Sequence, residues 1–508
     1  MLSKTITASL RGVDGELICV ETDLARGLPT LNVVGLAGTM IREAGARIRA
    51  AITNSGYEYP MKRITINLSP AGNRKEGSHF DLPLAVGILA AQGAVNHEKL
   101  GDIVFFGELS LDGKVKGSRG ILPLVSAVVE SGMKKIVLPK ENAGEAALVK
   151  GAILYGVREL SEVVLLLNSS GDSYIYKGKK NFKAEAKKEI QDYGEIVGQE
   201  GGKRGMMLCA SGGHGVLMTG SPGAGKTLLA KGLVGILPPM SDEEKLAVTK
   251  VYSVAGRLSE TLPYIGERPF RSPHHGITVA GLIGGGNPPR PGEFSLAHHG
   301  ILFLDELPLF EGMVLDALRE PMETDEVNLA RQTGAVTFPG KVILVATANP
   351  CKCGYWGDPT RECTCSPGEL SRYQNRLSGP LMDRIDLHMR INRVNYRAKG
   401  ERLSSAQMRE QVLGVRERQA YRYRGTGLFF NGQLAGGLIK EYCPLGTKEE
   451  ELLVMAYERL SLSMRTCHKT IKIARTIADL QGAEKISCDH LAEALQYRRE
   501  NDETRRNL

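Results

Sequence analysis

The chain has 508 residues, too many for one hydrophobic core, so we expect about two to four domains of ordinary size. Hydrophobic residues make up 42% and charged residues 24% of the chain, which excludes a disordered or fibrous protein. The net charge of +8 comes from 65 basic and 57 acidic residues, and this small excess permits a polyanionic partner without requiring one.

The N-terminal stretch MLSKTITASLRGVDGELICVETD has no apolar core or small-residue cleavage site of the kind found in signal peptides. No apolar run approaches membrane-spanning length, so we expect a cytoplasmic protein without a membrane partner. The nine cysteines are an odd number, and several stand singly among apolar neighbours, as reduced, buried thiols do. A disulfide framework is not expected.

Residues 1–167 alternate strand-like and helix-like patterns, which predicts an α/β domain. Apolar alternation over residues 63–69 predicts a strand, and helical patterns cover residues 41–54 and 82–92. Residues 168–194 are polar and rich in lysine, which favours a solvated linker over a binding site.

Residues 195–394 alternate again, and this predicts a second α/β domain. Apolar runs at 215–219, 301–304 and 342–347 have the character of strands in a buried parallel sheet. Residues 395–508 are expected to form an all-helical module, with amphipathic helices predicted over residues 404–423, 448–462, 467–481 and 490–499.

A nucleotide-binding motif lies in the segment GVLMTGSPGAGKTLLA, between a predicted strand and a predicted helix. In this pattern glycines let backbone amides face phosphates, the lysine reaches the β- and γ-phosphates, and the threonine is a magnesium ligand. The motif predicts an ATP site with magnesium, and its residues are Gly220, Ser221, Pro222, Gly223, Ala224, Gly225, Lys226 and Thr227.

Two further strand ends supply polar side chains. ILFLDEL delivers Asp305 and Glu306 at the end of four apolar residues, and open α/β sheets hold their ligands at such strand ends. Asp305 suits the magnesium shell, and Glu306 suits activation of the attacking water. VILVATANP ends at Asn349, whose amide is placed to hold the water or the γ-phosphate, although an asparagine before a proline is by itself a turn residue.

Together, GSPGAGKT, GEFSLAHHGILFLDEL, VATANPC, GPLMDRIDLH and ARTIADL resemble the magnesium-chelatase-like AAA+ ATPases, specifically the YifB/ComM family. The resemblance extends over nearly the whole chain. It implies an α/β multidomain fold with a Lon-protease-like N-terminal domain, an AAA+ P-loop core and a helical C-terminal lid. It also implies an ATP hydrolase that assembles into a homo-oligomeric ring, expected to be a hexamer.

The resemblance assigns two arginines to the ATP site. Arg384 in GPLMDRIDLH matches the arginine finger that enters the neighbouring subunit's site; the alternative is a surface pair with Asp383 or Asp386. For the sensor 2 arginine of the lid we favour Arg465 over Arg475, with ordinary charged helix positions as the alternative.

The front domain resembles the protease domain of Lon, which uses a serine nucleophile and a lysine base. Laid over that pattern, the nucleophile's position falls on His79 and the lysine's position falls near Leu122. Without a paired nucleophile and base the chemistry has no activated attacker, and Ser78, one place away, is expected to be structural. We expect a peptidase fold without peptidase activity that serves assembly or DNA contact.

Four cysteines in two CxC pairs flank a loop rich in turn residues, and they are Cys351, Cys353, Cys363 and Cys365. Four thiols of this kind in a cytosolic protein predict a tetrahedral zinc site, with reduced or redox-active thiols as the alternative. Two histidine pairs nearby, His274 with His275 and His298 with His299, are expected to be structural.

Two segments match the pore-lining hairpins of the clade, and they place Arg290 and Arg331 to meet a phosphate backbone. ComM-type relatives are associated with branch migration of DNA during transformation and recombination. The leading hypothesis is therefore an ATP-driven DNA translocase, a helicase-like motor with DNA as its partner. The alternative is an ATP-dependent protein-remodelling chaperone of the magnesium-chelatase type.

Overall fold

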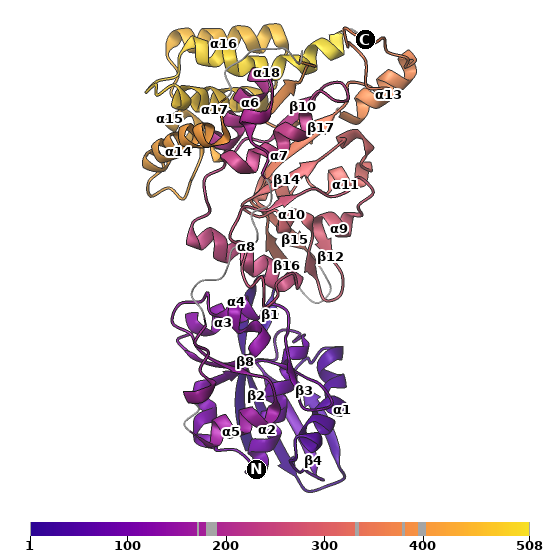
Figure 1. The fold of residues 1–508 in the computed structure, drawn as a ribbon, viewed down its shortest axis with the longest axis vertical. Helices are drawn as coiled ribbons and strands as arrows, with labels where there is room; N and C mark the ends of the chain where they lie inside the picture. Colours follow the sequence, from indigo (N-terminus) through magenta and orange to yellow (C-terminus); the bar gives the residue numbers. More distant parts are fainter. Residues whose placement is uncertain are drawn as a thin grey trace.

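The computed structural model describes residues 2–169, 172–178, 190–330, 335–377, 381–394 and 403–506. Along the long axis of the molecule, an N-terminal domain lies at one end, a central domain lies in the middle, and a bundle of C-terminal helices lies at the other end (Figure 1). Among these described residues no helix has the length and apolar character needed to cross a bilayer.

The N-terminal domain is a mixed seven-stranded sheet in the order β3-β4-β2-β1-β5-β8-β9. Its strands are β1 (Leu2–Arg11), β2 (Asp14–Ala25), β3 (Thr30–Val34), β4 (Arg63–Ser69), β5 (Ile103–Phe105), β8 (Lys135–Pro139) and β9 (Ile153–Val157), with a small ribbon of β6 (Glu108–Leu109) and β7 (Val115–Lys116). Its helices are α1 (Thr39–Asn54), α2 (Asp81–Gln92), α3 (Ile121–Glu130), α4 (Ala143–Ala146) and α5 (Leu160–Asn168).

Alternation along the central strands gives this sheet two apolar faces. In β8, Val137 belongs to a cluster with residues of α1, α2 and α5, whereas its neighbours Ile136 and Leu138 belong to a second cluster with residues of α3. Helices therefore cover both faces. The strand predicted over residues 63–69 and the helices predicted near residues 41–54 and 82–92 are confirmed as β4, α1 and α2.

The central domain contains a five-stranded sheet in the order β11-β14-β17-β10-β18, and every neighbouring pair is parallel. The strands are β10 (Val216–Thr219), β11 (Phe270–Arg271), β14 (Ile301–Leu304), β17 (Ile343–Ala348) and β18 (Leu387–Arg390). The helices are α6 (Glu200–Gly212), α7 (Lys226–Ile236), α8 (Asp242–Ala255), α9 (Val279–Ile283), α10 (Glu293–Leu296), α11 (Gly312–Asp316), α12 (Pro321–Thr324) and α13 (Pro367–Leu377). The predicted buried parallel sheet is confirmed.

Two hairpins emerge from the central domain. One pairs β12 (Gly284–Gly285) with β13 (Arg290–Pro291), and the other pairs β15 (Glu326–Leu329) with β16 (Val336–Pro339). β12 packs beside β15, and both hairpins lie on the side of the central domain that faces the N-terminal domain (Figure 1).

The C-terminal helices are α14 (Ser405–Arg422), α15 (Gly437–Tyr442), α16 (Thr447–Leu460), α17 (Met464–Leu480) and α18 (Cys488–Arg506). They share one apolar core with the central sheet, because Val412 of α14 and Ile473 of α17 cluster with Val216 of β10 and Val345 of β17. Tyr193, within the predicted linker, is also fully buried in this core, and its hydroxyl donates to the carbonyl of Leu229. The structured part of the central domain therefore extends into the predicted linker.

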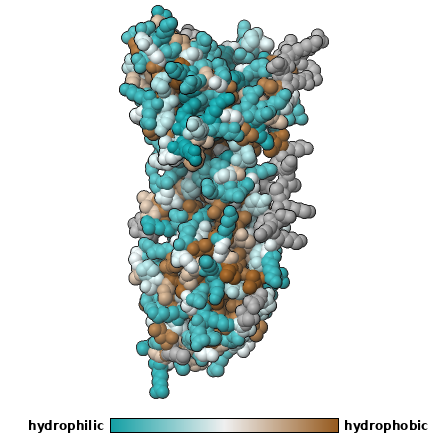
Figure 2. All heavy atoms as spheres, turned by 90° about the vertical axis from the view of Figure 1, so that its left-hand side faces the viewer, coloured by the Kyte–Doolittle hydropathy of each residue, from teal (hydrophilic) through white to brown (hydrophobic). Residues whose placement is uncertain are grey.

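Surface hydropathy differs along the long axis. On the face drawn in Figure 2, apolar residues gather over the half of the molecule that holds the N-terminal domain, and the end formed by the C-terminal helices is mostly hydrophilic.

Within the described part of the chain, the N-terminal and central domains are in contact at two places among others. The turn between β1 and β2 packs on the β15–β16 hairpin so closely that a Cβ on Gly12 would lie 2.3 Å from the carbonyl oxygen of Thr337. At the second place Gly120 donates its N–H to the carbonyl of Ser253 on α8 over 3.0 Å. Beside it the Ser253 hydroxyl donates to the Glu145 carboxyl over 2.5 Å. Glu145 is 5% exposed, and this burial raises its pKa to about 7.

We predict that Glu145 makes stability depend on pH. The folded carboxyl keeps its proton up to about pH 7, whereas the unfolded chain loses it near pH 4.5. The stability that the folded protein gains from this protonated group is therefore fully present below pH 4.5 and is lost as the pH rises through 7. Glu145→Gln stays neutral, so it should be more stable than the wild type by up to about 3 kcal/mol at pH 8, whereas the difference at pH 4 should be very small. Melting temperatures of both proteins at the two pH values measure the difference.

Glu141→Gln, an exposed carboxylate close by, is the matched control and should show no such change. A difference between wild type and Glu145→Gln that is the same at both pH values would contradict the prediction.

Candidate nucleotide site

The P-loop, formed by the motif residues 220–227, connects β10 with the first turn of α7. β10 lies in the interior of the parallel sheet. Gly225 caps α7 with φ 93°, a backbone conformation that glycine adopts without steric cost. Gly220 passes so close to β18 that a Cβ would lie 2.1 Å from the carbonyl oxygen of Ile391. The amides of the loop and the N-terminus of α7 thus meet at the carboxyl edge of the sheet, where anions bind.

Lys226 is held at this edge by neutral oxygen atoms. Its Nζ donates to the carbonyl of Gly220 over 2.5 Å, to the carbonyl of Ser221 over 3.1 Å and to Oδ1 of Asn349 over 3.0 Å. Burial lowers the pKa of Lys226, and the charges of Asp305 and Glu306 act in the opposite direction. The structure therefore brings together the lysine, the two acidic residues and the asparagine singled out in the sequence.

Thr347 joins the two acidic residues to the neighbouring strand. Its hydroxyl donates to Oδ1 of Asp305 over 2.5 Å and accepts the N–H of Glu306 over 3.0 Å. Glu306 has φ 54° and ψ 54°, a left-handed conformation that is uncommon for residues other than glycine and recurs at functional sites. Sequence reasoning missed Thr347, although its place in β17, two residues before Asn349, was a usable signal.

The two candidate arginines both pair with Glu323 of α12. Arg384 Nη2 is 2.8 Å and Arg465 Nη2 is 3.4 Å from Oε1 of Glu323. Asp386, one of the two alternative partners, pairs instead with His214 at 2.9 Å and with Lys469 at 2.8 Å. The ion pair of Arg384 with Glu323 was not predicted from the sequence.

Arg475, the less favoured sensor arginine, is in a different environment from Arg465. It is 2% exposed and bonds Asp479 and the carbonyls of Ala483 and Glu484. These partners all lie at the end of α17 and just beyond it. Arg475 therefore stabilises the C-terminal helices, which is consistent with the preference for Arg465.

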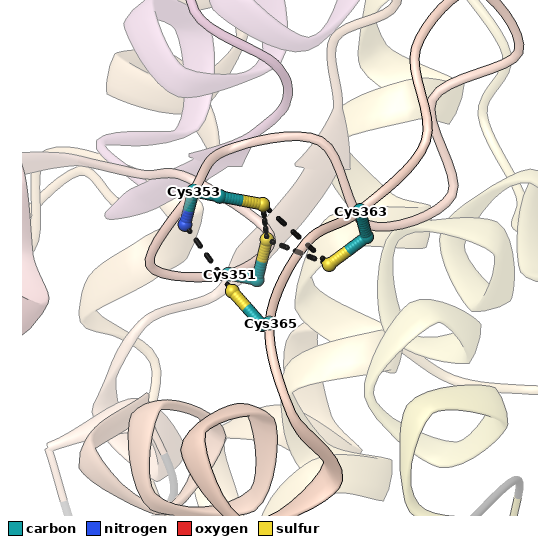
Figure 3. A group of neighbouring side chains, drawn as sticks. All are labelled: Cys351, Cys353, Cys363 and Cys365. Carbon is teal, nitrogen blue, oxygen red and sulfur yellow. Dashed lines mark hydrogen bonds between the residues drawn. The ribbon is translucent and has the colours of Figure 1, made fainter.

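The four cysteines converge in the loop between β17 and α13, and their sulfur atoms point toward one another (Figure 3). Among the described residues they form the one group of side chains placed to hold a metal ion, with all four Sγ atoms within 4.8 Å of one another. Cys351 Sγ is 3.3 Å from Cys353 Sγ and 3.6 Å from Cys363 Sγ. Four thiolates at about 2.3 Å from one tetrahedral zinc ion would stand roughly 3.8 Å apart, so the cluster is close to that geometry.

The histidine pairs have partners within the fold. His298 Nδ1 accepts the N–H of Lys341 at 3.1 Å, and burial lowers its pKa to about 3. His299 pairs with Glu244 at 3.2 Å, and His274 Nδ1 accepts the N–H of Gly276 at 3.1 Å. These contacts agree with the structural role expected for them.

In the N-terminal domain, His79 occupies the position matched to the Lon nucleophile. It is 2% exposed, its Nε2 bonds the carbonyl of Ala8 at 2.9 Å, and burial lowers its pKa to about 4. Leu122, at the position matched to the lysine base, is fully buried. Lys75 donates to the carbonyl of Pro70, so its ammonium is engaged by the backbone.

Of the two arginines expected to meet DNA, Arg290 is exposed on the β12–β13 hairpin. Arg331 lies outside the described residues, in the connection between β15 and β16. The structure therefore places one of the two.

A P-loop next to the ends of two strands that carry Asp305, Glu306 and Asn349 on one parallel sheet is the arrangement of a P-loop ATPase of the AAA+ class. Family models match most of the chain: "Magnesium chelatase, subunit ChlI" matches residues 192–399, "Subunit ChlI of Mg-chelatase" matches residues 20–142, and "Magnesium chelatase, subunit ChlI C-terminal" matches residues 402–498.

Sequence identity to known proteins supports the same family. The chain is 40% identical over 501 residues to competence protein ComM of Haemophilus influenzae, covering 96% of this chain and 95% of the relative. It is 40% identical over 504 residues to YifB of Escherichia coli, covering 98% and 97%. A shorter match, 25% identical over 166 residues, links 30% of the chain to 20% of the Lon protease of Trichlorobacter lovleyi. The chain belongs to the YifB/ComM family of magnesium-chelatase-like AAA+ ATPases.

The bridge made by Thr347 gives a prediction for ATP turnover. Thr347→Val keeps the shape of this buried side chain but removes both hydrogen bonds to the acidic residues, so we expect the kcat for ATP hydrolysis to fall roughly tenfold while ATP binding is retained. Thr347→Ser keeps the hydroxyl and should stay close to the wild type. Equal turnover in the valine variant and the wild type would show that the bridge does not matter.

Proposed function

We propose that this ATPase works as a ring-shaped, ATP-driven DNA translocase of the branch-migration type in the cytoplasm. The observation that carries the proposal is the pair of hairpins beside the N-terminal domain, one of which presents the exposed Arg290. An arginine that contacts the DNA backbone binds phosphate and does not read the base sequence. The similarity to a relative named as a competence protein supports the same assignment.

In the nucleotide site we propose one role for each residue brought together at the sheet edge. Lys226 binds the β- and γ-phosphates, Thr227 and Asp305 hold magnesium, Glu306 orients and activates the attacking water, and Asn349 positions that water or the γ-phosphate. The donor set suits magnesium, which prefers oxygen ligands. When bound, the ion neutralises charge on the phosphates.

The arginine cluster supports a site shared between subunits. Arg384 and Arg465 meet on Glu323, whose side chain is 47% exposed, while Lys226 is bonded within its own sheet edge. We infer that in a homo-oligomeric ring, expected to be a hexamer, Arg384 acts as the arginine finger on the neighbouring subunit's nucleotide. Arg465 beside it is the proposed sensor 2 arginine.

Two further assignments complete the proposal. The N-terminal domain is a Lon-protease-like domain without peptidase chemistry, because His79 and Leu122 stand where the nucleophile and base would be. It serves assembly or DNA contact. The four-cysteine cluster is a structural zinc site, since its Sγ spacing suits tetrahedral thiolate coordination.

The experiment that tests the function measures ATP hydrolysis with and without single-stranded and branched DNA. We expect severalfold stimulation by DNA. Arg290→Ala should require more DNA for the same stimulation. The plot of the logarithm of its DNA-binding constant against the logarithm of salt concentration should have a slope shallower by about one, because one phosphate contact is lost.

Arg290→Lys retains the charge and is the matched control, expected to stay near the wild type. Hydrolysis that responds to a protein partner and is indifferent to both DNA forms would contradict the proposal and favour the protein-remodelling alternative.

A further inference from the structure

The cysteine loop, residues 349–366, lies directly on the P-loop. At its start Asn349 accepts from Lys226. In its middle Gly354 approaches Pro222 so closely that a Cβ would lie 2.7 Å from the proline ring. Beyond that, Asp358 Oδ2 accepts the hydroxyl of Ser221 over 2.5 Å. Three separate points of the cysteine loop therefore touch three residues of the nucleotide-binding segment.

The contact with the P-loop is fixed by neighbouring polar groups. Oδ1 of Asp358 accepts both the N–H of Thr360 at 2.8 Å and its hydroxyl at 2.6 Å, which holds the carboxylate toward Ser221. From the adjoining strand, Arg390 donates to the carbonyl of Gly357 at 2.8 Å. Arg393 donates to the carbonyl of Pro222 at 3.0 Å. The rim of the P-loop is thus held by the cysteine loop and by the residues at the end of β18.

No regular secondary structure organises the cysteine loop between β17 and α13, and loops of this length without helices or strands are uncommon in compact domains unless they carry a function. The four sulfur atoms gather the loop instead. Cys351 is fully buried, its Sγ accepts the N–H of Trp356 at 3.3 Å, and Cys365 Sγ accepts the N–H of Cys353 at 3.4 Å. These two N–H donors fix the positions of the two sulfur atoms within the loop.

We propose that a divalent metal ion of the zinc type, held by the four cysteines, locks the cysteine loop onto Ser221 and Pro222 and thereby sets the affinity of the P-loop for ATP. Without the ion the segment from Cys351 to Cys365 loses its cross-link and its contacts with the rim, and the P-loop must be ordered by the nucleotide itself. Binding then costs more ordering entropy, so affinity falls. The inference rests on two parts of the proposed function, ATP binding and the zinc site of the four cysteines.

The chain provides its own reporter for the test, because Trp356 in the cysteine loop is its one tryptophan. Protein purified without a histidine tag is analysed for metal content, for the Kd of ATP in the presence of magnesium, and for Trp356 emission. We expect the wild type to hold one zinc per chain. Cys363→Ser should hold none, should show altered Trp356 emission, and should bind ATP about tenfold more weakly.

Two variants separate the metal from its effect. Asp358→Ala leaves the thiols intact, so it should keep its zinc and still bind ATP about fivefold more weakly, because the bond to Ser221 is lost. Cys19→Ser, in β2 of the N-terminal domain, should match the wild type in every measurement. If Cys363→Ser does not fold, Asp358→Ala still decides whether the cysteine loop supports the P-loop.

A wild-type chain without stoichiometric metal would overturn the inference together with the proposed zinc site and leave the proposed ATPase standing. A folded Cys363→Ser or Asp358→Ala variant with wild-type affinity for ATP would overturn the inference alone. A wild-type chain that binds no ATP would overturn the proposed function together with this inference.

Discussion

The nucleotide site depends on the parallel pairing of β10 with β17, which sets Thr219 opposite Ala348. Because both strands end at the same edge, the P-loop and Asn349 emerge side by side, and Lys226 reaches Asn349 although 123 residues separate them. β14 adds Asp305 and Glu306 on the other side of β17. A slip in this register would separate the lysine from the acidic residues. The continuous apolar runs of these strands, which bury the sheet on both faces, therefore also hold together the chemistry at its edge.

Lys226 and the two candidate arginines have different surroundings. Lys226 is buried among oxygen acceptors at the sheet edge, whereas Arg384 and Arg465 meet a partly exposed Glu323 on α12. The pair of Arg465 with Glu323 is largely exposed, and exposed ion pairs contribute little to stability. This arrangement suits an ATPase whose site is completed by a second copy of the chain.

The sequence predicted elements with strong periodicity well: the predicted strand over residues 301–304 is β14, and the helix expected over residues 404–423 is α14, Ser405–Arg422. It also identified the residues at the strand ends. It did not predict Thr347, Glu323 or Asp358, because their importance lies in partners distant along the chain. Asp358 and Ser221 are 137 residues apart. From the polar composition of its neighbours, Tyr193 was assigned to the linker. Its burial depends on packing against helices that follow it in the sequence.

The most direct test of the shared site is a mixing experiment with two inactive variants. Lys226→Ala removes the nucleotide contact but keeps Arg384, and Arg384→Ala does the opposite. If each site takes its arginine from a neighbour, mixed rings contain some intact sites, and equal amounts of the two variants should recover a substantial fraction of wild-type ATP hydrolysis. Hydrolysis in the mixture that stays at the level of the separate variants, although mixed rings form, would contradict a site shared between chains.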